Sequence, residues 1–227
     1  MKTINLSNKN LDSIDLSEFD EYLNEKYRKN HKQGGYGFHD KSGVEQYKLL
    51  AYMSTLLNNE TILDVGTFEG GSALALSKNK TNNIISIDVK YQVNRDIDLD
   101  NILFLEGDIL NDEEEIIKID RNFRSGVLNK GYGKELIKQS KLILYDTVHD
   151  GVVEKQFHDY LVKSDWSGVC IWDDTKYRWT GAVRQGMVDF WDSIENEKED
   201  VTKYAHWTGT GMVWYNQDKD INLKWKH

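Results

Sequence analysis

Residues 61–72 read TILDVGTFEGGS, an apolar run followed at once by a glycine-rich segment. The apolar run has the length and the aliphatic content of a buried strand. Gly66 and Gly70 then precede a stretch that can form a helix from Ser72 onward. A strand, a glycine loop and a helix in this order turn backbone N–H groups and the positive end of a helix toward a ligand. We therefore expect a ligand-binding loop at this position.

Four more short apolar runs follow along the chain, at residues 84–89, 102–105, 142–145 and 169–172. They are rich in Ile, Leu and Val, as is typical of parallel strands that are buried on both faces. Helix-compatible segments separate them, such as residues 72–78 and 152–161. This alternation predicts an α/β fold with a Rossmann-like, doubly wound, mostly parallel sheet. Residues 201–207 and 212–215 flank a Thr-Gly-Thr-Gly turn and predict a C-terminal antiparallel hairpin that closes the sheet.

Other segments complete the expected architecture. Residues 14–30 carry apolar side chains at helical spacing and predict an amphipathic helix. Ser42 and Glu45 have the form of a capping box, which predicts a second helix that ends near Leu57. The interval 111–141 is longer than a crossover needs, and we interpret it as an insertion in which the stretch RNFRSGVLNKGYG, residues 121–133, is a surface loop between two helical pieces. We expect residues 1–227 to form a single domain, in which residues 1–41 are an N-terminal helical extension with a glycine-rich loop.

The composition argues against several classes of protein. The 227 residues include 38 Asp and Glu against 29 Lys and Arg, and the formal charge of −9 opposes binding to a phosphate backbone. Proline is absent, so the Pro-Pro pair of DNA-modifying methyltransferases cannot occur. No apolar run approaches the roughly 18 residues of a membrane helix. The N-terminus lacks the apolar core of a secretory signal, and Cys170 is the single cysteine. We expect a cytoplasmic protein with no nucleic-acid and no membrane partner.

The glycine loop fits one cofactor class better than others. Phe68 stands where the dinucleotide fingerprint G-x-G-x-x-G needs its second glycine, and the lysine and Ser/Thr pair of a P-loop are missing. The pattern D-x-G-x-x-x-G instead resembles that of S-adenosyl-L-methionine (SAM)-dependent methyltransferases with a Rossmann-like fold. Asp88 ends the next strand 22 residues after Gly66 (88 − 66), close to the roughly 20-residue offset at which an acidic residue binds ribose hydroxyls.

The resemblance to SAM-dependent methyltransferases also assigns a role to Asp108, which follows the third strand where these enzymes contact adenine. Asp108 taken alone fits ordinary turn chemistry equally well. The expected cofactor-binding residues lie in or shortly after the first three expected strands. They are Asp64, Gly66, Gly70, Ser72, Asp88 and Asp108.

Acidic residues end the fourth and fifth expected strands, Asp146 after LILY and Asp173 with Asp174 after VCIW. Parallel neighbours about 4.8 Å apart would bring these carboxylates into one crevice. Because they would repel one another there, a divalent cation with oxygen ligands is expected, Mg²⁺, Mn²⁺ or Ca²⁺ rather than Zn²⁺. His149 lies three residues beyond Asp146 and could accept a proton in the same crevice. The alternatives are that these acids cap helices and that the histidine only packs.

Together these motifs resemble metal-dependent small-molecule O-methyltransferases over about residues 42–215. The resemblance covers the catechol type and the macrolide-sugar type, typified by macrocin and mycinamicin O-methyltransferases. It implies that Asp146, Asp173 and Asp174 bind Mg²⁺ (or Mn²⁺). The sugar-modifying branch has a histidine base three residues after the first metal-binding aspartate, which matches His149, whereas the catechol branch uses lysine there. The resemblance therefore implies a SAM-dependent, class I O-methyltransferase of the sugar-like branch.

The loop that follows Asp173 and Asp174 indicates which kind of acceptor to expect. Trp179 lies among polar neighbours there and could form a stacking wall for a ring, and Arg178 could bind an acidic group. By contrast, Trp166, Trp191 and Trp214 are expected to be packing residues. We therefore expect a small hydroxylated acceptor, a sugar in the first instance, with Arg178 and Trp179 as substrate-binding residues.

Rival interpretations remain at this point. The chain could be a SAM-binding or metal-binding module without turnover, or an aromatic O-methyltransferase of the catechol type. A nicotinamide-dependent oxidoreductase is disfavoured by Phe68, and Tyr160 is followed four residues later by Ser164, not by the lysine of a Tyr-x-x-x-Lys pair. The sequence leaves the oligomeric state open, a homo-oligomer included.

Overall fold

The computed structural model describes residues 2–4, 6–23, 38, 43–93, 97–111, 113–120, 123–176, 182–205, 207–216 and 223–225. In this part of the chain a nine-stranded sheet has the order β6-β5-β4-β3-β2-β7-β8-β10-β9. Its five parallel strands are β2 (Thr61–Val65), β3 (Asn83–Asp88), β4 (Ile102–Glu106), β7 (Ser140–Tyr145) and β8 (Gly168–Asp173). These strands confirm all five apolar runs of the sequence.

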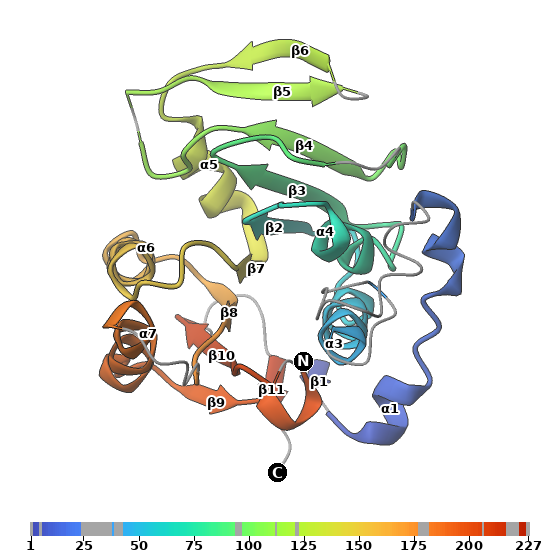
Figure 1. Cartoon of the computed structure of the whole chain (residues 1–227), viewed down its shortest axis with the longest axis vertical. Helices are drawn as coiled ribbons and strands as arrows, with labels where there is room; N and C mark the ends of the chain where they lie inside the picture. Colours follow the sequence, from blue (N-terminus) through green and yellow to red (C-terminus); the bar gives the residue numbers. More distant parts are fainter. Residues whose placement is uncertain are drawn as a thin grey trace.

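Helices cover both faces of this sheet (Figure 1). The helices are α3 (Val44–Thr55) and α4 (Gly71–Leu76) with one core cluster, and α5 (Tyr132–Gln139), α6 (Val152–Lys163) and α7 (Ala182–Ser193) with the other. Side chains of a strand alternate between the two clusters, so that Leu142 and Leu144 belong to the first and Ile143 and Tyr145 to the second. The doubly wound α/β fold predicted from the sequence is confirmed.

The strand order reverses between β2 and β7, because β3 and β4 lie on one side of β2 and β7 and β8 lie on the other. Such a switch point leaves a crevice outside the carboxyl ends of the strands, and ligands of open α/β sheets bind there. Asp146 directly follows β7 at this edge, and its backbone N–H donates to the carbonyl of Val65 at 2.9 Å. The expected site residues on both sides of the reversal thus meet at one edge of the sheet.

The C-terminal antiparallel hairpin is present with a different first strand. β10 (Thr210–Tyr215) runs antiparallel to β8 and to β9 (Lys198–Asp200). Part of the expected strand 201–207 is instead the short 3-10 helix η2 (Thr202–Tyr204). The side chain of Asp200 accepts hydrogen bonds from the backbone N–H and the hydroxyl of Thr202, and this local turn ends the strand.

In the N-terminal segment the structure differs from the single helix that the sequence predicts over residues 14–30. The structure has α1 (Asn8–Asp12) and the 3-10 helix η1 (Ser17–Tyr22), and residues 24–30 lie outside the described residues. Asp15 interrupts the helical pattern, because its carboxylate accepts the backbone N–H of Ser17 at 2.9 Å. Apolar spacing still identified the buried side chains, since Leu16, Phe19 and Leu23 lie in the core.

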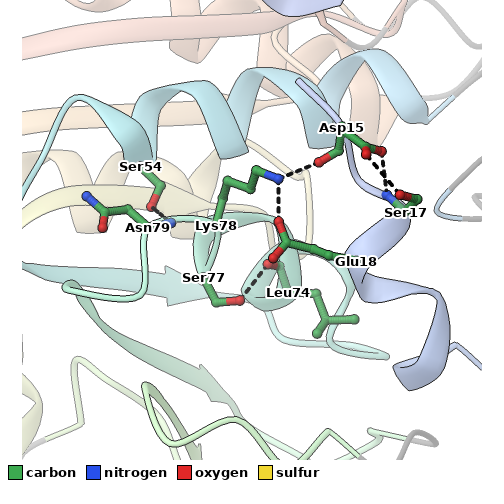
Figure 2. A network of polar contacts seen from close by, with 8 residues as sticks. All are labelled: Asp15, Ser17, Glu18, Ser54, Leu74, Ser77, Lys78 and Asn79. Carbon is green, nitrogen blue, oxygen red and sulfur yellow. Dashed lines mark hydrogen bonds and ion pairs between the residues drawn. The ribbon is translucent and has the colours of Figure 1, made fainter. Parts of the chain in front are cut away.

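Lys78 joins this N-terminal segment to the end of α4. Its Nζ donates to the carbonyl of Asp15 at 2.6 Å and pairs with the carboxylate of Glu18 (Figure 2). The aliphatic core below is continuous with α3 and α4. The extension is therefore packed onto the face of the sheet that carries the glycine-loop helix.

The structure also differs from the prediction for the first part of the interval 111–141. It forms the antiparallel strands β5 (Ile116–Asp120) and β6 (Phe123–Leu128), followed by α5. These strands extend the sheet beyond β4, as Figure 1 shows at its top. The two buried side chains of β5, Ile116 and Ile119, are three residues apart and belong to different core clusters, so IIKID lacks the alternation of a half-buried strand and was mistaken for part of a helix.

Two smaller features complete the fold. Helix α3 has Gly43 as its N-cap, and Ser42 of the expected capping box lies outside the described residues. β1 (Lys2–Ile4) pairs in parallel with β11 (Leu223–Trp225), and this small sheet brings segments near the two chain ends together. In the described part of the chain, no helix is long and apolar enough to cross a membrane.

Candidate active site

The glycine loop after β2 lies directly against the end of β7. Gly66 has φ +100°, and a Cβ placed on it would come within 1.6 Å of the carbonyl oxygen of Asp146. Gly70 has φ +85° and begins α4 as its N-cap, where a Cβ would approach Ile97 at 2.7 Å. Both positions need glycine for conformation, and Gly66 needs it for space as well, because its Cβ would meet a backbone oxygen. The loop and the acidic residue after β7 therefore form one continuous surface.

Asp64 lies beneath this loop, in β2. It is fully buried, and its Oδ2 accepts hydrogen bonds from Ser72 at 2.9 Å and Ser86 at 2.6 Å. Its Oδ1 has no hydrogen-bond partner among the described residues. Burial raises the pKa of Asp64 to about 7, although the two serine hydrogen bonds act in the opposite direction. Asp64 and Ser72 thus support the loop from below, with one carboxylate oxygen left for a proton or a ligand.

Asp88 is the last residue of β3, and Asp108 follows β4. The carboxylate of Asp88 accepts the backbone N–H of Phe68 at 3.0 Å and that of Lys90 at 3.2 Å, which ties the end of β3 to the glycine loop. Asp108 accepts the N–H of Leu110 at 2.9 Å and so closes a turn. Both side chains are partly exposed, and a carboxylate oxygen has further lone pairs for a ligand hydroxyl or amine.

The acidic residues after β7 and β8 converge as the sequence predicts. The two strands are parallel neighbours with Tyr145 opposite Trp172, so Asp146 and Asp173 follow at the same level. His149 lies between carboxylates: its Nε2 is 3.2 Å from Oδ1 of Asp146, and its Nδ1 is 3.8 Å from Oδ2 of Asp174. Sequence positions from two strands thus form one cluster at the switch point.

The charges in this cluster are strongly coupled. Burial, together with the charges of Asp146 and Asp174, raises the pKa of Asp173 well above its usual value. Burial alone would lower the pKa of His149, but its hydrogen bond to Asp146 and the surrounding carboxylates raise it to about 9. His149 therefore carries a proton at neutral pH, and its positive charge offsets part of the negative charge around it.

The donor chemistry of this cluster fits a hard divalent cation, since three carboxylates supply oxygen ligands and a negative potential. In the described part of the chain, however, no group of three or more His, Cys, Asp or Glu side chains is arranged to hold a metal ion. The ring of His149 stands between Asp146 and Asp174. A cation could occupy this position only after a rearrangement of that ring.

The backbone at this edge is strained in a way that the sequence did not reveal. Phe68, His149 and Asp174 each have a positive φ, at 44°, 60° and 56°, which non-glycine residues rarely adopt. They follow β2, β7 and β8 respectively. Such strain collects at functional sites.

A buried glutamate was also missed. Glu154 lies on α6 and accepts the backbone N–H of His149 at 2.9 Å and that of Gly151 at 2.9 Å. The signal in the sequence was a glutamate three residues after Gly151, which is the position of a capping-box partner.

Exposed apolar side chains surround the site. Phe68, Val89, Val148 and Trp207 are each 58–72% exposed, and the first three follow β2, β3 and β7. Trp207 precedes β10, whose first residue, Thr210, pairs with Asp173. Arg178 and Trp179, the expected substrate residues, lie outside the described residues. Trp166, Trp191 and Trp214 are buried, as expected for packing residues.

The fold is shared with solved structures. No protein-family model matches the sequence, and no curated protein matches it. Cofactor-bound Rv0187 from MTB is 10% identical, with a TM-score of 0.51 over 76% of this chain and 80% of that one. The O-methyltransferase from Bacillus cereus in complex with SAH is 14% identical, with a TM-score of 0.50 over 88% of this chain and 90% of that one. At these identities the likeness concerns the fold alone, a Rossmann-like fold that this chain shares with the O-methyltransferase from Bacillus cereus.

Proposed function

We propose that this protein is a SAM-dependent O-methyltransferase that acts on a small hydroxylated acceptor. The observation that carries the proposal is the contact between the two halves of the site. Gly66 of the expected cofactor loop lies against the carbonyl of Asp146, and the side chain of Asp146 bonds to His149. A cofactor in the loop and an acceptor beside His149 would therefore be neighbours, as methyl transfer requires. The Bacillus cereus O-methyltransferase with SAH, which has this fold, agrees with the proposal.

Methyl transfer from a sulfonium is an in-line displacement, so the chain needs no covalent nucleophile. It must hold the acceptor oxygen, the methyl carbon and the sulfur in line, and such positioning supplies much of the rate enhancement. The glycine loop with Asp64 and Ser72 would hold SAM, Asp88 would bind its ribose and Asp108 its adenine. His149 would then remove the proton of the acceptor hydroxyl.

Asp146, Asp173 and Asp174 would hold a divalent cation, Mg²⁺ or Mn²⁺, in this proposal. When bound, such an ion offsets the carboxylate charge, lowers the pKa of a hydroxyl beside it and favours the neutral form of His149. Neutral His149 is the form that accepts a proton, whereas its pKa of about 9 keeps it protonated at neutral pH in this structure.

A sugar is the acceptor that we propose first. Trp207 and Val148 are exposed apolar side chains at the same edge as the acids, and an aromatic face beside polar groups is suited to stacking against a sugar ring. We also propose that Arg178 and Trp179 bind the substrate, because they closely follow Asp174 in the chain. Catechol-type acceptors are the alternative and belong in the same test.

Calorimetry with SAM and SAH tests cofactor binding first. Purified protein is then incubated with SAM and a panel of nucleotide sugars, glycosides and catechols, with Mg²⁺ or with EDTA, and SAH is quantified. The expected outcome is Mg²⁺-dependent SAH formation with a glycoside or nucleotide sugar. Absence of SAM binding would refute the whole proposal, and full turnover in EDTA would refute the metal role alone.

A second candidate is a SAM-binding module without turnover. The position of the His149 ring between Asp146 and Asp174 favours it, since the described side chains leave no ready-made cation site. SAM binding with no Mg²⁺ binding in calorimetry and no SAH from any acceptor would decide for this candidate.

A further inference from the structure

We propose that Glu154 is the positioning residue of this site: its buried carboxylate fixes the loop 147–151 and thereby the place of His149. The inference rests on the proposed role of His149 as the base. Glu154 is 1% exposed, although glutamate is almost never fully buried without partners. Its partners are the backbone N–H of His149, the backbone N–H of Gly151 and the hydroxyl of Thr147, at 2.9, 2.9 and 3.2 Å.

The contact with His149 matters because that residue has a conformation which its own side chain disfavours. His149 has φ +60°, and a non-glycine residue there persists only where its surroundings hold it. The hydrogen bond from its backbone N–H to Glu154 fixes the backbone at the strained residue itself. The same backbone sets the ring 3.2 Å from Asp146 and 3.8 Å from Asp174.

Helix α7 holds the loop from the other side. A Cβ on Gly151 would lie 2.1 Å from the carbonyl oxygen of Gly186, and a Cβ on Gly186 would lie 2.0 Å from that of Asp150. The loop backbone is therefore pressed between α7 and the carboxylate of Glu154. Because α7 blocks movement of the loop on one side, the hydrogen bonds of Glu154 on the other side hold residues 147–151 in this conformation.

Capping of α6 alone does not explain Glu154. Asp150 already caps the start of this helix, because its Oδ1 accepts the backbone N–H groups of Val152 and Val153 at 2.7 and 3.0 Å. The bonds of Glu154 to His149 and Thr147 lie before the helix and add nothing to its first turn. Asp150 also interacts with the carboxylate of Glu154 through its own side chain, so the matched control is Asp159, a carboxylate on the exposed side of the same helix that pairs with Lys155.

The test compares Glu154→Gln with Asp159→Asn, the same change of a carboxylate to an amide at an exposed position of α6. A glutamine amide has one acceptor oxygen, and its NH₂ group cannot accept an N–H, so the variant loses at least one bond to the loop while the side-chain volume is kept. The ring signals of His149 in NMR spectra at fixed pH, kcat and KM for the acceptor found above, and the Kd of SAM are measured for both variants and the wild type.

Glu154→Gln is expected to shift the His149 ring signals and to lower kcat about 10- to 100-fold, with the Kd of SAM changed less than about twofold. Asp159→Asn is expected to leave the His149 ring signals and kcat near those of the wild type, because Asp159 pairs with Lys155 on the exposed side of α6. Wild-type ring signals and kcat in Glu154→Gln would overturn the proposal, as would equal losses in both variants. If the wild type does not bind SAM, the proposed function fails, and the ring signals still decide the role of Glu154.

Amide exchange in the wild type gives a second test that needs no folded variant. The amide hydrogens of His149 and Gly151 are expected to exchange much more slowly than that of Val148, whose side chain is exposed, because both bond to a buried carboxylate. Exchange of all three at one rate would overturn the proposal.

Discussion

His149 is held as a cation by its neighbours. Three carboxylates face it, and their combined field outweighs the burial that would otherwise lower its pKa. Burial and the like charges of Asp146 and Asp174 also raise the pKa of Asp173, which favours the neutral form of that carboxyl group. The protons on His149 and Asp173 therefore reduce the net negative charge of the cluster. A positively charged ligand would lower the pKa of both residues and so change their protonation.

The pKa of about 9 for His149 lies above its unfolded value near 6.5, which fixes the sign of the pH dependence. The stability that His149 contributes is present in full below pH 6.5 and is lost as the pH rises through about 9. We expect the difference in free energy of unfolding between the wild type and His149→Ala to shrink over this window in metal-free buffer. Urea unfolding at pH 6, 7.5 and 9.5 measures it, and a difference that does not change with pH would contradict the prediction.

Gly66→Ala is expected to destabilise the protein strongly. The positive φ alone costs about 1–2 kcal/mol for an L-residue, and the new methyl group would overlap the carbonyl of Asp146. The matched control is Gly126→Ala in β6, where a Cβ meets nothing within 4 Å and the change should stay within about 0.5 kcal/mol. Urea unfolding compares the two, and similar values for both would show that the loop does not need its glycine.

At the scale of elements, strands that are buried on both faces were predictable and half-exposed ones were not. The runs that became β2, β7 and β8 are continuous and apolar, because both core clusters contact them. β5 and β6 lie at the edge of the sheet with exposed residues, so their polar composition hid them. The helix expected over 14–30 failed because a side-chain contact between Asp15 and Ser17 replaces it locally.

The link between η1 and α4 gives a test at this scale. Lys78 is mostly buried and bonds to both Asp15 and Glu18, so Lys78→Met should destabilise the fold by about 1 kcal/mol and speed proteolysis within residues 6–23. Lys155→Met removes an exposed pair with Asp159 within α6 and should cost no more than about 0.5 kcal/mol. Equal effects in urea unfolding and limited proteolysis would mean that Lys78 does not anchor the segment.

At the scale of the whole molecule, the sequence located the site but did not reveal how it is held. The strand-end positions of Asp88, Asp146 and Asp173 follow from the order of apolar runs, since parallel strands end at one edge. The support of His149 by Glu154 depends on the fold of the loop and on α7, which no spacing reveals. The pairing of β1 with β11 joins segments more than 200 residues apart and could not be read from local patterns.

Binding of SAM should stabilise the whole molecule, because its loop joins β2, β3 and β7 through Gly66 and Asp88. A ligand at about 100 times its Kd stabilises the folded state by about 2.7 kcal/mol, which a thermal shift detects. Asp88→Ala should lower SAM affinity by about 1.5–3 kcal/mol, roughly 10- to 100-fold, through the loss of charge-assisted hydrogen bonds to ribose. Asp159→Ala, on the exposed side of α6, serves as the control and should keep wild-type affinity. A wild-type thermal shift in Asp88→Ala would remove Asp88 from the cofactor site, because the carboxylate would then serve only to hold the backbone of Phe68 and Lys90.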